Sequence, residues 1–283
     1  MLSDYRCFYC LTRAFEKLLE KENISRDAKR SFTRDMIRIY QDNWDKFNAP
    51  EFAQAIHTVF KNYTGNPDPY KKVKKENNKL VISLYPELKK LVNWSKDSFK
   101  SALKLAIAGN IMDFAAGDNF NLHSTIEKAL KSEFAIDHSE KLKERLGKAR
   151  KVLYLGDNAG EIVLDKLFIE TINHHCITFV VRGTPVINDA TMEDAEFVGM
   201  KKIAKVISNG YDAPSTILGK SGSEFRKYFR EADLIISKGQ GNLEGLISLG
   251  DERIFFLLMV KCNVIAEMLK IKKDSLIVLN TTV

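Results

Sequence analysis

Hydrophobic residues follow two different rhythms along the chain, and the change comes near residue 150. Up to about Gly147 they recur three or four positions apart, as on one face of an α-helix; one such stripe holds Phe32, Met36 and Tyr40. After Lys151 they stand in short runs that cover residues 152–155, 177–181, 204–207, 234–236, 254–259 and 276–279. The first rhythm predicts helices, and the second predicts buried strands that alternate with helices.

Strands that alternate with helices are typical of a parallel sheet with helices on both faces. We therefore expect a mainly helical N-terminal domain over residues 1–147, packed on a doubly wound, Rossmann-like α/β/α domain over residues 148–283. Within the helical domain, the stretch 80–91 reads as helix, but Pro86 is expected to break or begin it. Proline lacks the backbone N–H that a helix interior uses.

The composition is that of an ordinary globular protein. Of 283 residues, 45% are hydrophobic and 29% are charged, values that exclude a disordered or fibrous chain. No apolar run is long enough to span a bilayer, and the first residues lack the pattern of a signal peptide. Four cysteines are too few for a disulfide scaffold of this size. We expect a cytoplasmic protein of enzyme size that does not bind membranes, and its oligomeric state stays open.

The chain is basic, with 44 Lys and Arg against 37 Asp and Glu, a formal net charge of +7. Lysines cluster at 71–75 and between 141 and 151. A nucleic-acid surface would have this charge, but few aromatic residues interleave with these lysines, so solvated helix faces are the favoured interpretation. A positive field would also attract small anionic substrates.

The segment 151–165, KVLYLGDNAGEIVLD, carries the first candidate site. A short apolar run predicts a strand, and Asp157 and Asn158 follow its end directly. Gly160 allows a tight turn into a helix, in which Glu161 falls in the first turn. In open α/β sheets, ligands bind beyond the carboxyl ends of the strands. Asp157 and Asn158 are therefore candidate ligands.

Two further strand ends carry polar residues. Arg182 follows the run 177–181 and leads to a loop with Asn188 and Asp189. The run 234–236 is followed by SKGQGNLE, and its polar or flexible positions are Lys238, Gly239, Asn242 and Glu244. Because parallel strands bring their carboxyl ends to one edge of the sheet, we expect all three groups to converge.

The chemistry of this set indicates phosphoryl transfer. Carboxylate and amide oxygens suit Mg²⁺ or Mn²⁺, and no thiol or imidazole lies beside them to favour Zn²⁺. Lys238 and Arg182 suit a phosphoryl group, and the glycines of KGQGN let backbone N–H groups approach an anion. Structural alternatives stay open for each piece: Asp189 as a helix N-cap, the Asp157–Asn158 pair as a turn, and Lys238 as a surface residue.

Two other groups of residues stand apart from the strand ends. Asn110 and Asp113 lie on one face of an otherwise apolar helix, AIAGNIMDFAA, and either form structural hydrogen bonds or close the site. Cys7 and Cys10 form a lone C-x-x-C, for which a packing role is favoured over a metal or redox site. No histidine is assigned to chemistry.

The motifs GDNAGE, INDAT and SKGQGNLE, preceded by AGNIMDFA and the C-x-x-C, occur in an order that resembles the metal-dependent damage-control phosphatase family. This family is also known as domain of unknown function 89. The resemblance extends from Cys7 to the C-terminus, and the C-x-x-C resembles that of the prokaryotic, archaeal-type branch. It implies a helical N-terminal part, an α/β/α C-terminal part, and hydrolysis of phosphates of sugars, cofactors or their damaged forms.

The resemblance also implies roles for individual residues. Asp157, Asn158 and Asp189 would hold one divalent ion, Mn²⁺, Co²⁺, Ni²⁺ or Mg²⁺, and Lys238 would bind the substrate phosphate. We expect Asp157 and Lys238 to be catalytic, with Asp157 either a ligand only or also a nucleophile or base. The residues expected to contribute to substrate binding are Asn110, Asp113, Glu161, Arg182, Lys238, Gly239, Asn242 and Glu244.

Two other functions stay open at this stage. One is an S-adenosylmethionine-dependent carboxyl methyltransferase, which a Rossmann-like sheet could host, although the glycine-rich cofactor loop is missing. The other is a non-enzymatic module that binds nucleic acid or another anionic partner through the lysine runs. A metal-dependent phosphatase that acts on a small phosphorylated metabolite accounts for more of the sequence than either alternative, because it explains all three polar strand ends.

Overall fold

The computed structural model describes residues 2–109 and 122–281. Its helices and strands follow in the order α1 (Tyr5–Lys21), α2 (Arg26–Asn43), α3 (Ala49–Thr64), α4 (Lys71–Trp94), α5 (Ser98–Ala108), α6 (Leu122–Lys131), β1 (Phe134–Asp137), α7 (Ser139–Lys148), β2 (Val152–Leu155), α8 (Glu161–Ile172), β3 (Ile177–Val181), α9 (Met192–Phe197), β4 (Lys205–Ser208), α10 (Ser223–Glu231), β5 (Leu234–Lys238), α11 (Gly239–Leu246), β6 (Ile254–Met259), α12 (Asn263–Leu269) and β7 (Leu276–Asn280).

The strands form one seven-stranded sheet in the order β1-β7-β6-β5-β2-β3-β4. Every neighbouring pair is parallel except β6 and β7, which are antiparallel. The chain leaves β2 toward β3 and β4 and later returns to the other side of β2 through β5. The carboxyl ends of β2 and β5 therefore flank a topological switch point, where sheets of this kind bind ligands.

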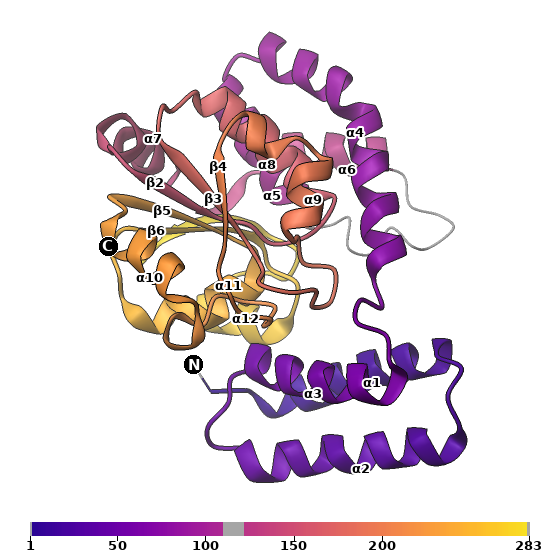
Figure 1. Ribbon diagram of the computed structural model, residues 1–283. Helices are drawn as coiled ribbons and strands as arrows, with labels where there is room; N and C mark the ends of the chain where they lie inside the picture. Colours follow the sequence, from indigo (N-terminus) through magenta and orange to yellow (C-terminus); the bar gives the residue numbers. More distant parts are fainter. Residues whose placement is uncertain (1, 110–121, 282–283) are drawn as a thin grey trace.

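Helices cover both faces of the sheet, as the sequence predicted (Figure 1). Alternate side chains of β2 supply the two cores: Tyr154 faces the side that α4, α5 and α8 cover, and Leu153 and Leu155 face the side of α10, α11 and α12. Because both faces are buried, β2 is apolar along its whole length. The doubly wound α/β architecture is thus confirmed.

Helices α1, α2 and α3 form a separate unit below the sheet domain in Figure 1. They have their own apolar core, which includes Phe32, Phe52 and Phe60. Helix α3 packs against α11, and Lys61 donates to the backbone oxygen of Pro185 at 2.5 Å. This unit therefore lies along the edge of the sheet where β2, β3 and β5 end.

Three details differ from the sequence prediction. Residues Phe134–Asp137, expected to be helical, form the edge strand β1, and β7 runs antiparallel to β6 in a sheet expected to be parallel. Pro86 lies inside α4 and neither ends nor begins it.

The helices after α3 pack on the sheet, and the division into domains at 147/148 stays a prediction.

Candidate functional site

The turn after β2 places Asp157 and Asn158 at the switch point. Both side chains are buried, with exposed fractions of 8% and 5%. Gly160 has a φ of +81° and begins α8 as its N-cap, a conformation in which a residue with a side chain is strained. The predicted turn at Gly160 is confirmed, and it holds the two polar side chains beside the first turn of α8.

The loop after β3 runs antiparallel to this turn and is bonded to it through the backbone. The N–H of Ala190 donates to the oxygen of Asp157 at 2.7 Å, and the N–H of Ala159 donates to the oxygen of Asn188 at 2.9 Å. These bonds bring Asp189 beside the turn after β2. The predicted convergence of these two strand ends is confirmed.

Asp189 is not a helix N-cap, which removes the structural alternative for this residue. Helix α9 begins at Met192, and its N-cap is Thr191, which forms a capping box with Asp194. The Asp189 carboxylate instead accepts a hydrogen bond from Nε of Arg182 at 2.6 Å.

Arg182 lies between the two carboxylates. It is 2% exposed, and besides Asp189 its Nη2 lies 3.4 Å from Oδ1 of Asp157. Its Nη1 donates to Oδ1 of Asn242 at 3.1 Å, and the Asn242 amide donates in turn to the backbone oxygens of Gly156 and Lys238. One guanidinium therefore links the ends of β2, β3 and β5.

Lys238 is fully buried, and its ammonium donates three hydrogen bonds. The acceptors are Oε1 of Glu161 at 2.5 Å, Oδ1 of Asp165 at 2.6 Å and the backbone oxygen of Ala106 at 2.8 Å. Burial acts to lower the pKa of Lys238, but Asp165 and Glu161 outweigh it and raise that pKa above its ordinary value. Lys238 is thus a buried ion-pair residue rather than a surface residue, and a phosphate would have to replace one of these acceptors.

Two members of this network were not identified from the sequence. Asp165 pairs with Lys238, and it accepts a hydrogen bond from the hydroxyl of Tyr154 at 2.7 Å. Both are polar groups inside apolar segments, at 0% exposure. Asp165 also lies one helical turn after Glu161 on α8. Buried polar groups need partners, so this spacing was the available signal.

Gly239 approaches the Asp157 carboxylate more closely than any side chain would allow. Its φ is +79°, and a Cβ built there would lie 1.9 Å from Oδ2 of Asp157. The KGQGN segment, expected to be a loop, is the N-terminus of helix α11. The first N–H groups of a helix lack partners within it, so this end favours an anion, and the Asp157 carboxylate lies against it.

The site has more acidic than basic side chains. Its buried carboxylates are Asp157, Glu161, Asp165 and Asp189, and its buried cations are Arg182 and Lys238. Burial, then the charges of Asp189 and Glu161, raise the pKa of Asp157 well above its ordinary value, while Arg182 acts to lower it. A further cation at this point would stabilise the ionised carboxylates.

The donors fit a hard divalent ion. The amide nitrogen of Asn158 donates to Oδ2 of Asp157 at 2.8 Å and to Oε2 of Glu161 at 3.2 Å. The carbonyl oxygen of Asn158 therefore points away from these two acceptor oxygens. Two carboxylates and one amide oxygen, from Asp157, Asp189 and Asn158, are ligands of the type that Mg²⁺ and Mn²⁺ prefer. Within the described residues, no group of three or more His, Cys, Asp or Glu side chains is arranged to hold a metal.

Glu244 lies away from these carboxylates. Its Oε1 accepts a hydrogen bond from Gln240 at 2.8 Å. It lines a cavity of about 390 Å³ between α1, α3, α11 and α12, together with the thiols of Cys7, Cys10 and Cys262. Burial raises the pKa of Glu244 to about 7. Burial also raises the pKa of both C-x-x-C thiols, and the nearby Cys262 and Glu244 raise it further.

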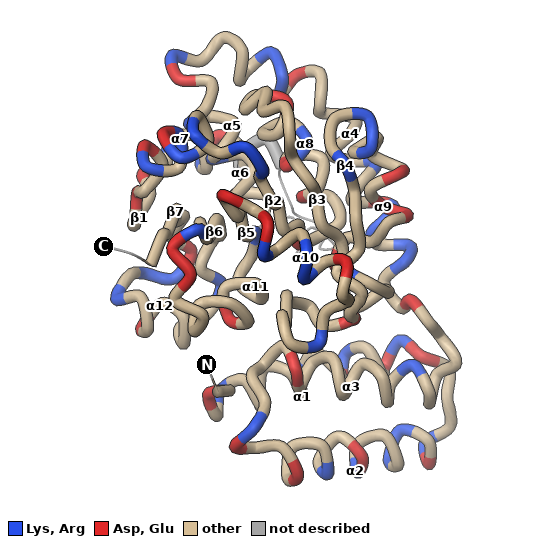
Figure 2. Tube along the Cα trace, turned by 60° about the vertical axis from the view of Figure 1, so that its left-hand side comes forward, with Lys and Arg blue, Asp and Glu red and all other residues tan. Residues whose placement is uncertain are grey.

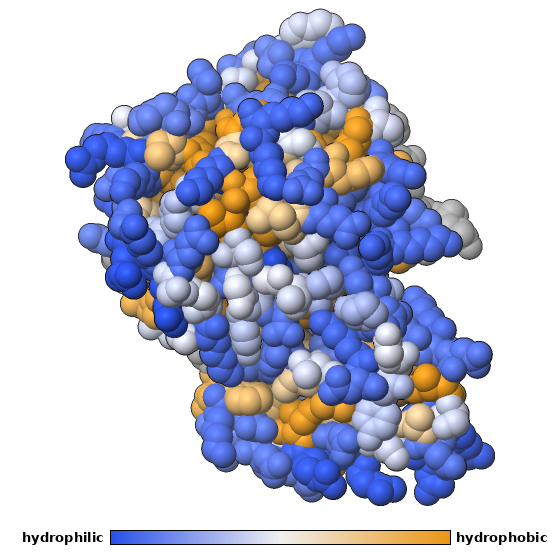
Figure 3. Space-filling model, viewed as in Figure 1, coloured by the Kyte–Doolittle hydropathy of each residue, from blue (hydrophilic) through white to orange (hydrophobic). Residues whose placement is uncertain are grey.

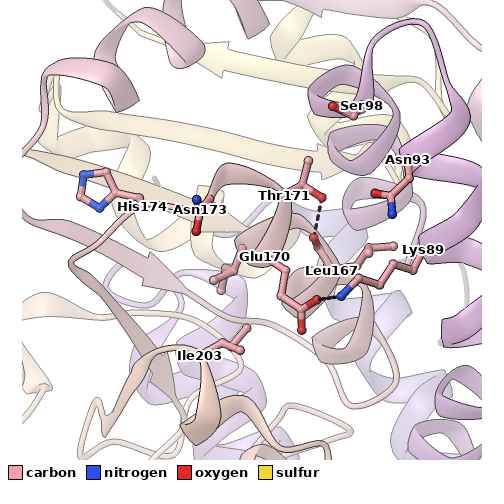
Figure 4. Close-up of a pocket in the computed structure, with 10 residues that line it drawn as sticks. Lys89, Asn93, Ser98, Leu167, Glu170, Thr171, Asn173, His174 and Ile203 are labelled. Atoms are coloured by element: carbon pink, nitrogen blue, oxygen red, sulfur yellow. Dashed lines mark hydrogen bonds and ion pairs between the residues drawn. The ribbon is translucent and has the colours of Figure 1, made fainter.

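Asn110 and Asp113 lie outside the described residues, so their predicted contribution to the site stays a prediction. Another cavity, of about 580 Å³, lies at the far end of α8 and is lined by Lys89, Glu170 and His174 among others (Figure 4). Helix α8 begins at the candidate site and extends for 12 residues, so about 16 Å separates its two ends. Of the predicted site residues that the structure describes, none lines that cavity.

The surface shows mixed character. Figure 2 shows Lys and Arg interspersed with Asp and Glu along the helices, and within the lysine clusters Lys148 pairs with Glu144 and Lys72 with Glu76. Figure 3 shows hydrophobic patches on both the sheet domain and the α1–α3 unit, separated by hydrophilic residues. None of the helices in the described ranges 2–109 and 122–281 is long and apolar enough to cross a membrane.

Residues 3–277 match the model of the damage-control phosphatase ARMT1-like domain. The chain belongs to this family. It is 33% identical over 282 residues to "Damage-control phosphatase PH1575" of Pyrococcus horikoshii, covering 98% of this chain and 97% of the relative. It is 36% identical over 241 residues to "Damage-control phosphatase" of Archaeoglobus fulgidus, covering 82% and 83%.

Structural comparison with solved proteins agrees with this family membership. The crystal structure described as a DUF89 family protein from P. horikoshii superposes with a TM-score of 0.91 at 32% identity, over 100% of both chains. The family predicted from the motif order is therefore confirmed, and so is the fold class. Family membership supports a phosphatase activity for this chain.

Proposed function

We propose that this protein is a divalent-metal-dependent phosphatase that hydrolyses a small phosphorylated metabolite. The single observation that carries the proposal is the convergence of Asp157, Asn158 and Asp189 at the switch point, with Arg182 between the two carboxylates. The relatives named damage-control phosphatases support the reaction class. Mn²⁺, Co²⁺, Ni²⁺ and Mg²⁺ are the candidate ions, and a cytoplasmic location is part of the proposal.

The metal would be held by Asp157, Asn158 and Asp189, and when bound it would supply positive charge to phosphate oxygens and a Lewis acid for water. Arg182 donates to both carboxylates and so fixes the orientation of their oxygens. Without this guanidinium the two buried anions would repel each other at close range.

Helix α11 is proposed to hold the other side of the phosphate. Its N-terminal N–H groups begin at Gly239, where the missing side chain lets the backbone approach Asp157. Lys238 would act on the site indirectly. Its ammonium donates to Glu161, and Glu161 in turn accepts a hydrogen bond from the Asn158 amide. Direct contact of Lys238 with phosphate, and a nucleophilic role of Asp157, stay predictions.

The methyltransferase and anion-binding alternatives stay untested, and no specific contact favours either. A first assay distinguishes them from the proposal. Metal-stripped protein is mixed with 4-nitrophenyl phosphate, and Mg²⁺, Mn²⁺, Co²⁺ and Ni²⁺ are added back singly. At least one ion should restore turnover, and Asp157→Asn and Asp189→Asn should each lower kcat by about 100-fold or more, because even outer-shell partners of a metal typically contribute about 10–100-fold.

Asp251→Asn is the matched control, because Asp251 pairs with Arg253 away from the site. This variant should keep the turnover of the unsubstituted protein. A folded protein without turnover under any of the four ions would contradict the proposal.

A further inference from the structure

A buried carboxamide on α4 reaches the turn that carries Asn158. Asn78 is 1% exposed, and its Oδ1 accepts a hydrogen bond from the backbone N–H of Gly160 at 2.6 Å. Gly160 is the N-cap of α8 and lies two residues after Asn158. This contact joins residues 82 positions apart in the chain, so no local sequence pattern indicates it.

The other end of the same carboxamide reaches the first turn of α9, the helix that follows Asp189. Nδ2 of Asn78 donates to Oδ1 of Asp194 at 2.9 Å. The second oxygen of Asp194 accepts from the N–H and the hydroxyl of Thr191, at 2.9 and 2.8 Å. Thr191 lies two residues after Asp189. One side chain thus connects the two loops that hold the proposed metal ligands, and we call Asn78, Gly160, Thr191 and Asp194 the Asn78 bridge.

A buried cation one helical turn earlier on α4 fixes the acidic member of the bridge. Lys74 is 3% exposed, and its Nζ lies 3.6 Å from Oδ2 of Asp194 and 2.8 Å from Oδ2 of Asp68. Lys74 thus lies beside the same Asp194 side chain that accepts from Asn78. Lys74 is therefore a structural residue, unlike the solvated lysines around it in the cluster at 71–75.

The bridge requires both a donor and an acceptor on one short side chain. The Gly160 N–H needs an acceptor, and the Asp194 carboxylate needs a donor. An aspartate at 78 would place two carboxylates against each other, and an alanine would leave two buried polar groups without partners. The Asn78 carboxamide satisfies both groups at once.

We propose that Asn78 is a positioning residue of the metal site: together with the backbone bonds of Ala159 and Ala190, it holds the turn after β2 against the segment after β3 and so helps to fix the distance between Asn158 and Asp189. This inference rests on the proposed function, because it assigns the purpose of the bridge to metal binding. Asn78 is not one of the proposed metal ligands and uses both polar atoms of its side chain in the bridge, so its effect should appear mainly in metal affinity.

Two variants test the bridge: Asn78→Asp alone, and the same change combined with Asp194→Asn, which conserves the net charge. In Asn78→Asp the dissociation constant for Mn²⁺, measured by calorimetry on metal-stripped protein, should rise about 10–100-fold, the usual effect of removing an outer-shell partner. The double variant Asn78→Asp with Asp194→Asn restores one donor and one acceptor, and the net charge equals that of the unsubstituted protein. Its Mn²⁺ affinity should return to within about 3-fold of the original.

Asn280→Asp is the matched control. Asn280 is buried at 0% exposure and donates to the backbone oxygens of Glu252 and Ile254, on the β6–β7 side of the sheet. The same substitution there should lower stability and leave the Mn²⁺ affinity unchanged. Equal Mn²⁺ affinity in folded Asn78→Asp and in the unsubstituted protein would overturn the inference, and so would a double variant that binds as weakly as Asn78→Asp.

A metal-free readout separates this inference from the proposed function. In Asn78→Ala the Gly160 amide loses its acceptor, so its hydrogen exchange in metal-stripped protein should accelerate, while in Asn280→Ala it should not. If the unsubstituted protein bound none of the four ions, the metal function would fail, yet faster exchange would still demonstrate the bridge. Unchanged exchange at Gly160 would refute the bridge itself.

Discussion

Two glycines with positive φ shape the backbone around the candidate site. Gly160 turns the chain into α8, and Gly239 turns it into α11. Gly239 also lets the backbone approach the carboxylate of Asp157, because a Cβ there would collide with Oδ2 of Asp157. Backbone conformation and site geometry are therefore coupled at this residue.

Replacing Gly239 by alanine should damage both stability and metal binding. A residue with a side chain at this φ costs about 1–3 kcal/mol, and the collision with Asp157 adds to that cost. Urea denaturation measures the first effect and Mn²⁺ calorimetry the second. Gly219→Ala is the control, since a Cβ at Gly219 meets nothing within 4 Å. A Gly239→Ala protein with unchanged stability and Mn²⁺ affinity would contradict this account of the glycine.

Glu244 should make stability depend on pH. Its folded pKa of about 7 exceeds the ordinary value of 4.5, because burial disfavours the charged form. The folded protein therefore holds this proton more tightly than the unfolded chain, and the free energy of unfolding falls as pH rises from 4.5 to about 7. Relative to the unsubstituted protein, Glu244→Gln should gain about 3 kcal/mol between pH 4.5 and pH 8.

Urea denaturation of both proteins at the two pH values measures this gain. The control is Glu224→Gln, the same substitution at an exposed position. A stability difference for Glu244→Gln that does not change with pH would refute the assignment.

The sequence indicated some site residues and not others for a clear physical reason. Asp157, Asn158 and Asp189 were found because they follow strands, and the ends of parallel strands meet at one edge. Asn78 and Asp165 were not found, because their partners lie on other elements and the residues sit within ordinary helical patterns. Pattern shows where a strand ends, whereas long-range hydrogen bonds need the packed structure.

Among the secondary-structure elements, the central strands were the most predictable. Strands β2 and β3 have the bounds that their apolar runs predicted, because both faces of each are buried. The edge strand β1 escaped detection, since only Phe134 of its four residues is buried and no apolar run marks it. The direction of β7 could not be predicted either, because a run of apolar residues does not indicate whether a strand is parallel or antiparallel to its neighbour.

Helix α4 continues through Pro86, at a cost that substitution should remove. Proline in a helix interior deprives the carbonyl four residues earlier of a donor and crowds it. Pro86 is exposed, so Pro86→Ala should stabilise the protein by about 1–2 kcal/mol after the loss of unfolded-chain stiffness is counted. The measurement is urea denaturation, with the exposed Lys90→Ala as a control expected to change little. A less stable Pro86→Ala protein would show that α4 needs the proline geometry.

For the whole molecule, the arrangement of the α1–α3 unit is the main feature that sequence could not supply. The helices were predicted, but their position along the ligand-binding edge of the sheet depends on contacts such as Gln54 with Asp212 and Lys220 with Glu51. These contacts place Cys7 and Cys10 in a cavity with Glu244 and Cys262. The C-x-x-C thus lies close to α11, although its role stays open.

In the proposed function, one divalent ion binds at the ends of β2 and β3 and contacts the substrate phosphate. The most direct measurement is the anomalous diffraction of crystals grown with Mn²⁺ and inorganic phosphate. We expect one strong manganese peak coordinated by oxygens of Asp157, Asn158 and Asp189, with phosphate between it and the N-terminus of α11. A manganese peak at another place, such as the cavity of Cys7, Cys10 and Glu244, with none at Asp157, would contradict the account.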